Sequence, residues 1–138
     1  MSLKLFVCGD VVNFTAKEDF IDDRLKEIIQ NSDIALCNLE APIQCDGMAP
    51  IHKVGPHIYQ PKESIVFLKD AGFNMLNLAN NHTMDHGAKG LTDTMNTLDE
   101  YGIAWFGAGT NTEEAASPVF VNVNGTVVGF LGYSAFPP

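Results

Sequence analysis

Four polar side chains come just after three separate apolar runs of the sequence. Asp10 and Glu40 follow the first and second runs, and Asn81 and His82 follow the third. Each run is expected to form a strand, and in open α/β sheets ligands bind beyond the carboxyl ends of the strands. Two carboxylates and an amide oxygen are hard donors suited to Mn, Mg or Fe, and an adjacent imidazole can ligate, transfer a proton or stabilise an oxyanion. The pattern predicts a divalent metal site formed by the two carboxylates and Asn81, with His82 beside it.

Simpler explanations exist for each residue taken alone. Asp10 follows a glycine, where an aspartate is commonly a helix cap or a turn former. Glu40 precedes Ala-Pro and is typical of a solvated side chain. The polar triplet at 80–82 can be satisfied by a turn network of its own. The metal-site interpretation therefore depends on three strand ends lying side by side.

The apolar pattern supports such a sheet. Apolar runs predict strands at residues 3–8, 34–39, 73–79 and 103–106. Helical periodicity and glycines at expected C-caps predict helices at residues 18–30, 63–71 and 91–100. A short helical piece at 113–116 is followed by two apolar runs that meet at Asn124-Gly125, which is a strong hairpin signal. The predicted fold class is α/β, a mainly parallel sheet with helices plus a C-terminal hairpin.

Length and charge limit the function classes. The chain has 138 residues, 46% of them hydrophobic, which suits one domain with a buried core. Its 8 Lys and Arg against 17 Asp and Glu give a net charge of −9, which argues against nucleic-acid binding. An anionic substrate, either a small molecule or a polymer, then needs positive charge from a bound metal ion. The absence of a membrane segment and three cysteines at no metal-ligand spacing favour a reducing, cytoplasmic location with free thiols.

Several further residues are weaker candidates. Asp85 is spaced to orient His82 through a bond from the imidazole N–H to its carboxylate. His86 lies four residues after His82, but the glycine that follows favours a loop, and ligation is the minority interpretation. Two histidines of the long loop at 41–61 are expected at the surface, with substrate contact as the alternative. The Gly107-Ala108-Gly109 run is only weakly similar to a phosphate-cradling turn because it lacks the full glycine fingerprint.

Short motifs occur along the whole chain in a fixed order. They are Gly9-Asp10, Asn38-Leu39-Glu40, Leu78-Ala79-Asn80-Asn81-His82, Asp85-His86-Gly87, Gly90-Leu91 and Gly102-Ile103 through Gly107-Ala108-Gly109. Together they resemble the bacterial capsule-synthesis family of CapA/PgsA type, which is similar to calcineurin-like metallophosphoesterases. The resemblance implies an α/β/β/α sandwich and two divalent metals, with metal ligation by Asp10, Glu40 and Asn81. It also implies that His82 is catalytic and helps to stabilise the transition state.

The resemblance carries further expectations about the extent of the domain. Val12 stands two residues after Asp10, where the wider superfamily usually has a histidine, and the remaining histidine ligands of the superfamily come from a later half. Residues 1–138 are therefore expected to be the N-terminal part of a metallophosphatase-like domain, with an incomplete site. A half-sandwich exposes a sheet face, so self-association through that face is expected. Family members are often membrane-anchored or extracellular.

Two functions are consistent with these residues. The first is a poly-γ-glutamate capsule biosynthesis protein with a metal-dependent, phosphoesterase-like hydrolase site that acts on a phosphoester or a related acyl bond. The alternative is a non-catalytic assembly or carrier component in which the metal site is vestigial. Metal binding together with hydrolysis of generic phosphoesters distinguishes the two.

Overall fold

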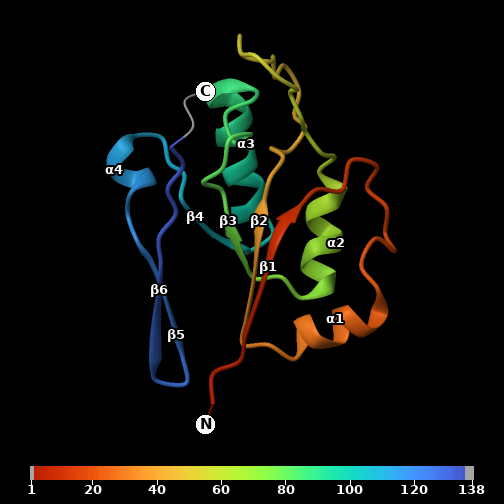
Figure 1. Cartoon of the computed structure of the whole chain (residues 1–138), viewed down its shortest axis with the longest axis vertical. Helices are drawn as coiled ribbons and strands as arrows, with labels where there is room; N and C mark the ends of the chain where they lie inside the picture. The colour runs from red at the N-terminus through yellow and green to blue at the C-terminus, as the bar shows by residue number, and fades with distance from the viewer. Residues whose placement is uncertain (1, 136–138) are drawn as a thin grey trace.

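A four-stranded parallel sheet forms the centre of the molecule in the computed structural model, which describes residues 2–135 (Figure 1). The strands lie in the order β1-β2-β3-β4, with bounds Leu5–Val11, Ile34–Leu39, Met75–Asn77 and Ala104–Phe106. The helices that connect them are α1 Asp23–Gln30, α2 Glu63–Ala71 and α3 Gly87–Glu100. A short helix, α4 Thr112–Ala115, leads to the antiparallel hairpin of β5 Val119–Val123 and β6 Thr126–Phe130. This arrangement confirms the predicted fold class.

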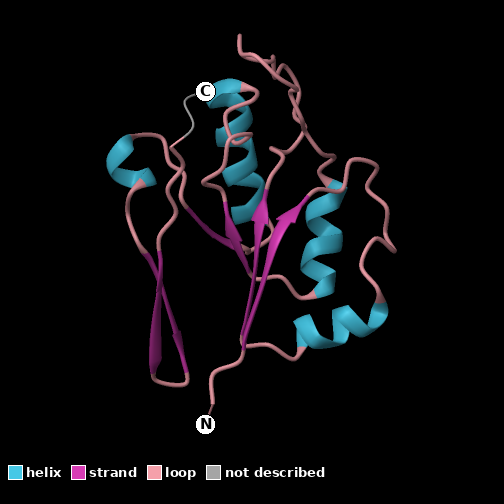
Figure 2. Ribbon diagram, viewed as in Figure 1, coloured by secondary structure: helices cyan, strands magenta, loops and turns pink. Residues whose placement is uncertain are grey.

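Helices cover one face of the sheet, and the hairpin packs on the other face over β2, β3 and β4 (Figure 2). Alternate residues of β2 divide between the two faces, since Ala35 and Cys37 belong to the core with the helices whereas Ile34 packs in a second cluster with the hairpin. Phe106 of β4 lies 5.5 Å from Phe130 of the hairpin between ring centroids. A strand buried on both faces explains the nearly continuous apolar run at 34–39.

Strand β1 contains an irregularity that decides where Asp10 lies. The strand continues to Val11, so the expected end at residue 8 was wrong. Its pairing with β2 shifts between Val7 and Asp10, which places Asp10 opposite Asn38. Such a bulge inserts a residue and redirects the side chains that follow it, and hydrophobic alternation does not reveal it. Asp10 therefore belongs to the last part of the strand instead of following it.

Local signals explain two other element boundaries. Helix α1 begins at Asp23 instead of residue 18, because the Asp22 carboxylate accepts a bond of 2.9 Å from the Arg24 backbone N–H and caps the helix there. In the hairpin turn, Asn124 and Gly125 have φ of 51° and 87°. These values are the left-handed conformations that a two-residue turn requires, and they confirm the hairpin predicted from the Asn-Gly pair.

The long loop between β2 and α2 is closed at its base and tied to the start of α3. The Gln44 backbone N–H donates to the Gln60 carbonyl at 2.8 Å, which joins the two ends of the loop. Farther along, the Ile51 N–H donates to the Asp85 carbonyl at 3.0 Å. A loop held in this way presents its side chains to α3 in a fixed position.

Apolar side chains remain exposed on the edge strand and on the outer side of the hairpin. Val7 of β1 is 58% exposed, and Phe120 and Val127 of the hairpin are 67% and 62% exposed. Self-association through an exposed sheet face stays a prediction. None of the helices in residues 2–135 has the length and apolar content needed to cross a membrane.

Candidate functional site

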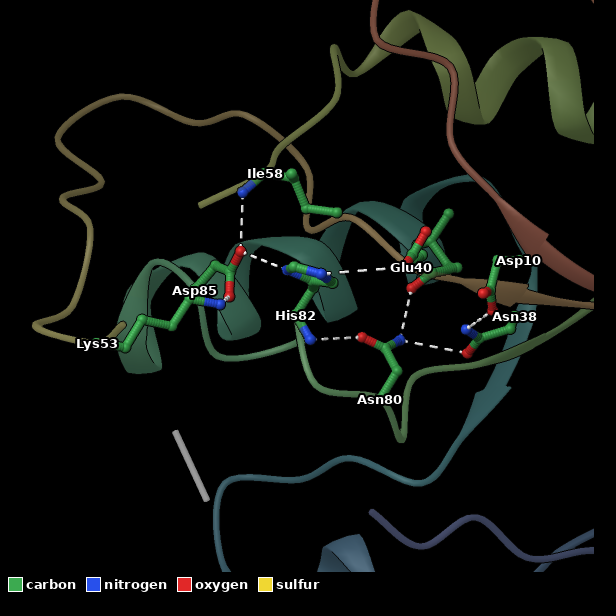
Figure 3. Close-up of polar contacts among 9 residues, drawn as sticks. Asp10, Asn38, Glu40, Lys53, Ile58, Asn80, His82 and Asp85 are labelled. Atoms are coloured by element: carbon green, nitrogen blue, oxygen red, sulfur yellow. Dashed lines mark hydrogen bonds and ion pairs between the residues drawn. The ribbon is translucent and has the colours of Figure 1, made fainter. Parts of the chain in front are cut away.

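Three asparagines connect the carboxyl ends of β1, β2 and β3, and Figure 3 shows two of them, Asn38 and Asn80. The Asn38 amide nitrogen donates to a carboxylate oxygen of Asp10 at 2.5 Å. The Asn38 amide oxygen accepts bonds from Asn77 at 2.8 Å and from Asn80 at 3.2 Å. Each amide is oriented by its neighbours, so the strand ends share one polar network, as the parallel sheet predicts.

Asn80 joins this network to the turn that carries His82. Its amide nitrogen also donates to the Leu39 carbonyl at 3.0 Å, and its amide oxygen accepts the His82 backbone N–H at 2.9 Å. The polar turn after β3 is therefore fixed to the residue that precedes Glu40. This connection brings the imidazole of His82 beside the Glu40 carboxylate.

The imidazole of His82 lies between two carboxylates. Its Nδ1 is 2.8 Å from Asp85 Oδ2, and its Nε2 is 3.9 Å from Glu40 Oε1 (Figure 3). An ionised carboxylate only accepts hydrogen bonds, so Nδ1 carries a proton that it donates to Asp85. Nε2 is then the ring nitrogen that faces Glu40 and is able to take or give a proton. The predicted orientation of His82 by Asp85 is the geometry observed.

Asp85 is buried, with a side chain only 1% exposed, and it accepts from three donors. These are the Lys53 ammonium, the Ile58 backbone N–H at 2.8 Å and the His82 ring. Burial on its own raises the pKa of the Asp85 carboxyl, but the bonds from Lys53, Ile58 and His82 outweigh it and lower the pKa below its ordinary value. Asp85 is therefore ionised at neutral pH and holds both the histidine and the long loop.

The four predicted site residues are not equivalent in the structure. Asp10, Glu40 and His82 are linked through the network of asparagines. Asn81 is exposed and lines a neighbouring cavity, while Asn80 is the member of the pair that bonds within the network. Metal ligation by the two carboxylates and Asn81 stays a prediction.

Sequence reasoning gave no role in this site to Asn38, Asn77 or Lys53. Asn38 is a polar residue near the end of the apolar run of β2, and that interruption was a usable signal. Lys53 reaches Asp85 from the middle of the long loop, 32 residues earlier in the chain. Nothing in the local sequence predicts that contact, because it depends on how the loop folds back onto α3.

The oxygen donors of this site suit a hard divalent cation. Among residues 2–135, no group of three or more His, Cys, Asp or Glu side chains is gathered closely enough to hold a metal ion by itself. Carboxylates from Asp10 and Glu40 would thus need amide oxygens, such as that of Asn81, to complete the coordination. Carboxylate and amide oxygens are the donors that Mg²⁺ and Mn²⁺ prefer, so the donor chemistry fits the predicted cofactor.

The other histidine candidates lie apart from the network. His86 is 7% exposed, its ring nitrogens have no hydrogen-bond partner among the described residues, and its ring centroid lies 5.7 Å from that of Tyr59 and 6.3 Å from that of His57. His57 bonds to the Ile51 carbonyl at 2.7 Å and is half-buried, whereas His52 is exposed as expected. The rings of His57 and Tyr59 pack the loop against His86 at the start of α3.

Two thiols contact the helix-side core, one on each of the strands that carry Asp10 and Asn38. Cys8 of β1 and Cys37 of β2 both contact that core, and neither forms a disulfide. A hydrogen bond from the Cys37 thiol outweighs burial and lowers the pKa of Cys8 to about 7, while the same bond and burial raise the pKa of Cys37. The third cysteine, Cys45, is also free, so the predicted free thiols are confirmed.

Residues 4–137 match the model of a protein family described as "Bacterial capsule synthesis protein PGA_cap". The chain belongs to this capsule synthesis family. A PGA_cap relative from Bacillus anthracis, "Capsule biosynthesis protein CapA", is 35% identical over 118 residues, which are 84% of this chain and 29% of the relative. "PGA biosynthesis protein CapA" of Bacillus subtilis is 32% identical over 117 residues, which are 84% of this chain and 31% of the relative.

A third relative comes from Mycobacterium tuberculosis. This "Probable polyglutamine synthesis accessory protein" is 34% identical over 98 residues, which are 70% of this chain and 26% of the relative. The chain spans less than a third of the length of these curated relatives. The match confirms the resemblance to the CapA/PgsA family and is consistent with the metallophosphoesterase superfamily.

Proposed function

We propose that this chain contributes a metal-dependent, phosphoesterase-like hydrolase site to a protein of capsule or polyglutamate biosynthesis. The observation that supports the proposal best is the position of His82, whose ring is held by Asp85 on one side and faces Glu40 on the other. Asp10 reaches the same polar network from the neighbouring strand. The names of the relatives from two Bacillus species support the biosynthetic context.

The residues would divide the work of hydrolysis in a defined way. Asp10, Glu40 and Asn81 would hold the cation, which supplies Lewis-acid polarisation of a phosphoryl oxygen and activation of a water. His82 would donate a hydrogen bond or a proton from Nε2 to the substrate oxygen, because Nδ1 is already committed to Asp85. Asp85 would keep the ring in this orientation.

Charge explains why a metal ion belongs in this proposal. The chain carries a net charge of −9, and the only ammonium in the described network, that of Lys53, is bonded to Asp85. An anionic substrate therefore gains little attraction from the side chains around His82. A bound divalent cation reverses the local charge and makes anion binding favourable.

The alternative, a non-catalytic assembly or carrier component, is favoured by one residue. Val12 is a half-buried aliphatic side chain two residues after Asp10, where the wider superfamily has a histidine. A site that lacks this ligand has fewer donors for a second cation. Metal binding without hydrolysis is the result expected of the non-catalytic protein.

Isothermal titration calorimetry of Mn²⁺ binding to the protein tests the proposal. We expect binding to be lost in Asp10→Asn and Glu40→Gln, and to be unchanged in Glu18→Gln, a control at an exposed position. Hydrolysis of p-nitrophenyl phosphate and bis(p-nitrophenyl) phosphate with Mn²⁺ should show the same dependence. Failure of the unmodified protein to bind Mn²⁺ would overturn the proposed site, and binding without any turnover would favour the non-catalytic alternative.

A further inference from the structure

A cavity of about 400 Å³ adjoins the polar network at the carboxyl ends of β3 and β4. Its walls come from the turn after β3, from residues 107–109 after β4, from α4 and from residues 132–134. The volume lies within the range of sites that bind small organic molecules. Asn80 and Asn81 line it, so the cavity shares a wall with the candidate metal site.

The lining of this cavity differs from the rest of the protein in charge. Among residues 2–135, those that line it include no Asp, Glu, Lys, Arg or His, although the whole chain is 18% charged. Aliphatic side chains such as Leu78, Met84 and Leu91 form much of the surface, and Asn81 and Thr83 add uncharged polar atoms. An anion in such a cavity loses hydration without gaining a counter-ion, so the cavity disfavours charged groups.

Close backbone packing gives one wall of the cavity a fixed shape. A Cβ added to Gly107 would lie 2.7 Å from the Ala79 Cβ, and one added to Gly132 would lie 2.6 Å from Asn77 Oδ1. A Cβ added to Gly109 would lie 2.5 Å from the Ala115 backbone nitrogen. These contacts explain the glycines at 107 and 109 as packing residues of a preformed wall, and not as a phosphate cradle.

We propose that this cavity binds the uncharged, largely apolar part of the substrate whose anionic group is bound beside Asp10, Glu40 and His82. The inference rests on the proposed function and specifies its substrate class: an anionic ester or acyl compound with a neutral organic group. Asn80 and Asn81 form the boundary between the two parts of the site. The charged end stays with the cation, and the neutral end is removed from water in the cavity.

Binding of 1-naphthol tests the cavity without metal and without turnover. In the unmodified protein we expect 1-naphthol to shift the backbone amide resonances of residues 78–84 and 107–109. Ala115→Phe, which adds a ring to the cavity lining, should weaken this binding by about tenfold or more. Ala88→Phe is the matched control, because Ala88 is an exposed residue of α3 outside the lining. Unshifted amides, or equal binding by the two variants, would overturn the inference.

A second measurement keeps failure of the cavity distinct from failure of the metal site. We expect Mn²⁺ to tighten the binding of 1-naphthyl phosphate, and Ala115→Phe to weaken this binding while Mn²⁺ affinity is kept. If Ala115→Phe binds 1-naphthyl phosphate in the presence of Mn²⁺ as tightly as the unmodified protein does, the naphthyl group does not use the cavity and the inference is rejected. If 1-naphthol binds but Mn²⁺ changes nothing for the phosphate, the proposed function and the assignment of this cavity to its substrate are both rejected.

Discussion

His82 and Asp85 lie three residues apart in the chain, and the ring Nδ1 of the histidine is 2.8 Å from a carboxylate oxygen of the aspartate. The same carboxylate receives Lys53 and the Ile58 backbone N–H from the long loop. One buried anion therefore organises a candidate catalytic side chain and a distant loop together. Its removal should affect both stability and the site.

Asp85→Asn should lower the free energy of unfolding by about 3 kcal/mol, because it leaves the nearly buried Lys53 ammonium without its counter-charge. The loss is measured by urea unfolding at pH 7. Asp70→Asn, at an exposed residue at the end of α2, is the control and should change stability by less than about 0.5 kcal/mol. A loss of the same small size in Asp85→Asn would contradict the structural role assigned to this ion pair.

The lowered pKa of Asp85 predicts the direction of the pH dependence. A carboxyl with a depressed pKa in the folded protein stabilises it above the unfolded value of 3.8, and this stabilisation is lost as pH falls through the folded pKa. Lys53→Met removes one of the bonds that lower the pKa, so the loss should be smaller in this variant and complete at a higher pH. Urea midpoints between pH 2 and pH 6 measure the difference. Identical pH profiles for the two proteins would show that Lys53 does not affect the ionisation of Asp85.

Asn80 and Asn81 are predicted to behave differently although they are adjacent. Asn80→Ala removes bonds to Asn38, Leu39 and His82 and should cost about 2 kcal/mol of stability. Asn81→Ala, at an exposed position, should leave stability nearly unchanged and weaken Mn²⁺ binding. Unfolding curves and Mn²⁺ titrations of both variants separate these effects. Unchanged Mn²⁺ affinity in Asn81→Ala would remove that residue from the ligand set.

Cys8 should react with iodoacetamide at pH 7 much faster than Cys45. A pKa of about 7 makes Cys8 partly thiolate at this pH. In contrast, burial and, to a smaller extent, a hydrogen bond with Asp93 raise the pKa of Cys45 to about 11. Cys37→Ala removes the bond that lowers the pKa of Cys8 and should slow its alkylation by roughly tenfold. Rates are followed by peptide mass analysis. Equal rates at Cys8 with and without Cys37 would contradict the thiol pair.

The hydrophobic pattern predicted the sheet and the hairpin because both depend on local spacing. It did not predict the bulge in β1, since a one-residue irregularity leaves the apolar run intact and changes only the pairing with β2. The polar turn at 80–82 was recognised, but the choice between Asn80 and Asn81 depends on turn geometry. Lys53 lay beyond prediction, because its partner is 32 residues away and the loop between β2 and α2 has no periodicity.

Hydrogen exchange at the Ile58 amide offers a way to observe the site in solution. Its acceptor is the carboxylate that also binds the His82 ring, so this proton exchanges with solvent only when that carboxylate is released. A backbone resonance 24 positions away from the histidine therefore reports on whether the long loop is still bound to the carboxylate that holds the ring. Deuterium uptake at Ile58 would then track opening of the candidate active centre in the native state, without any substrate.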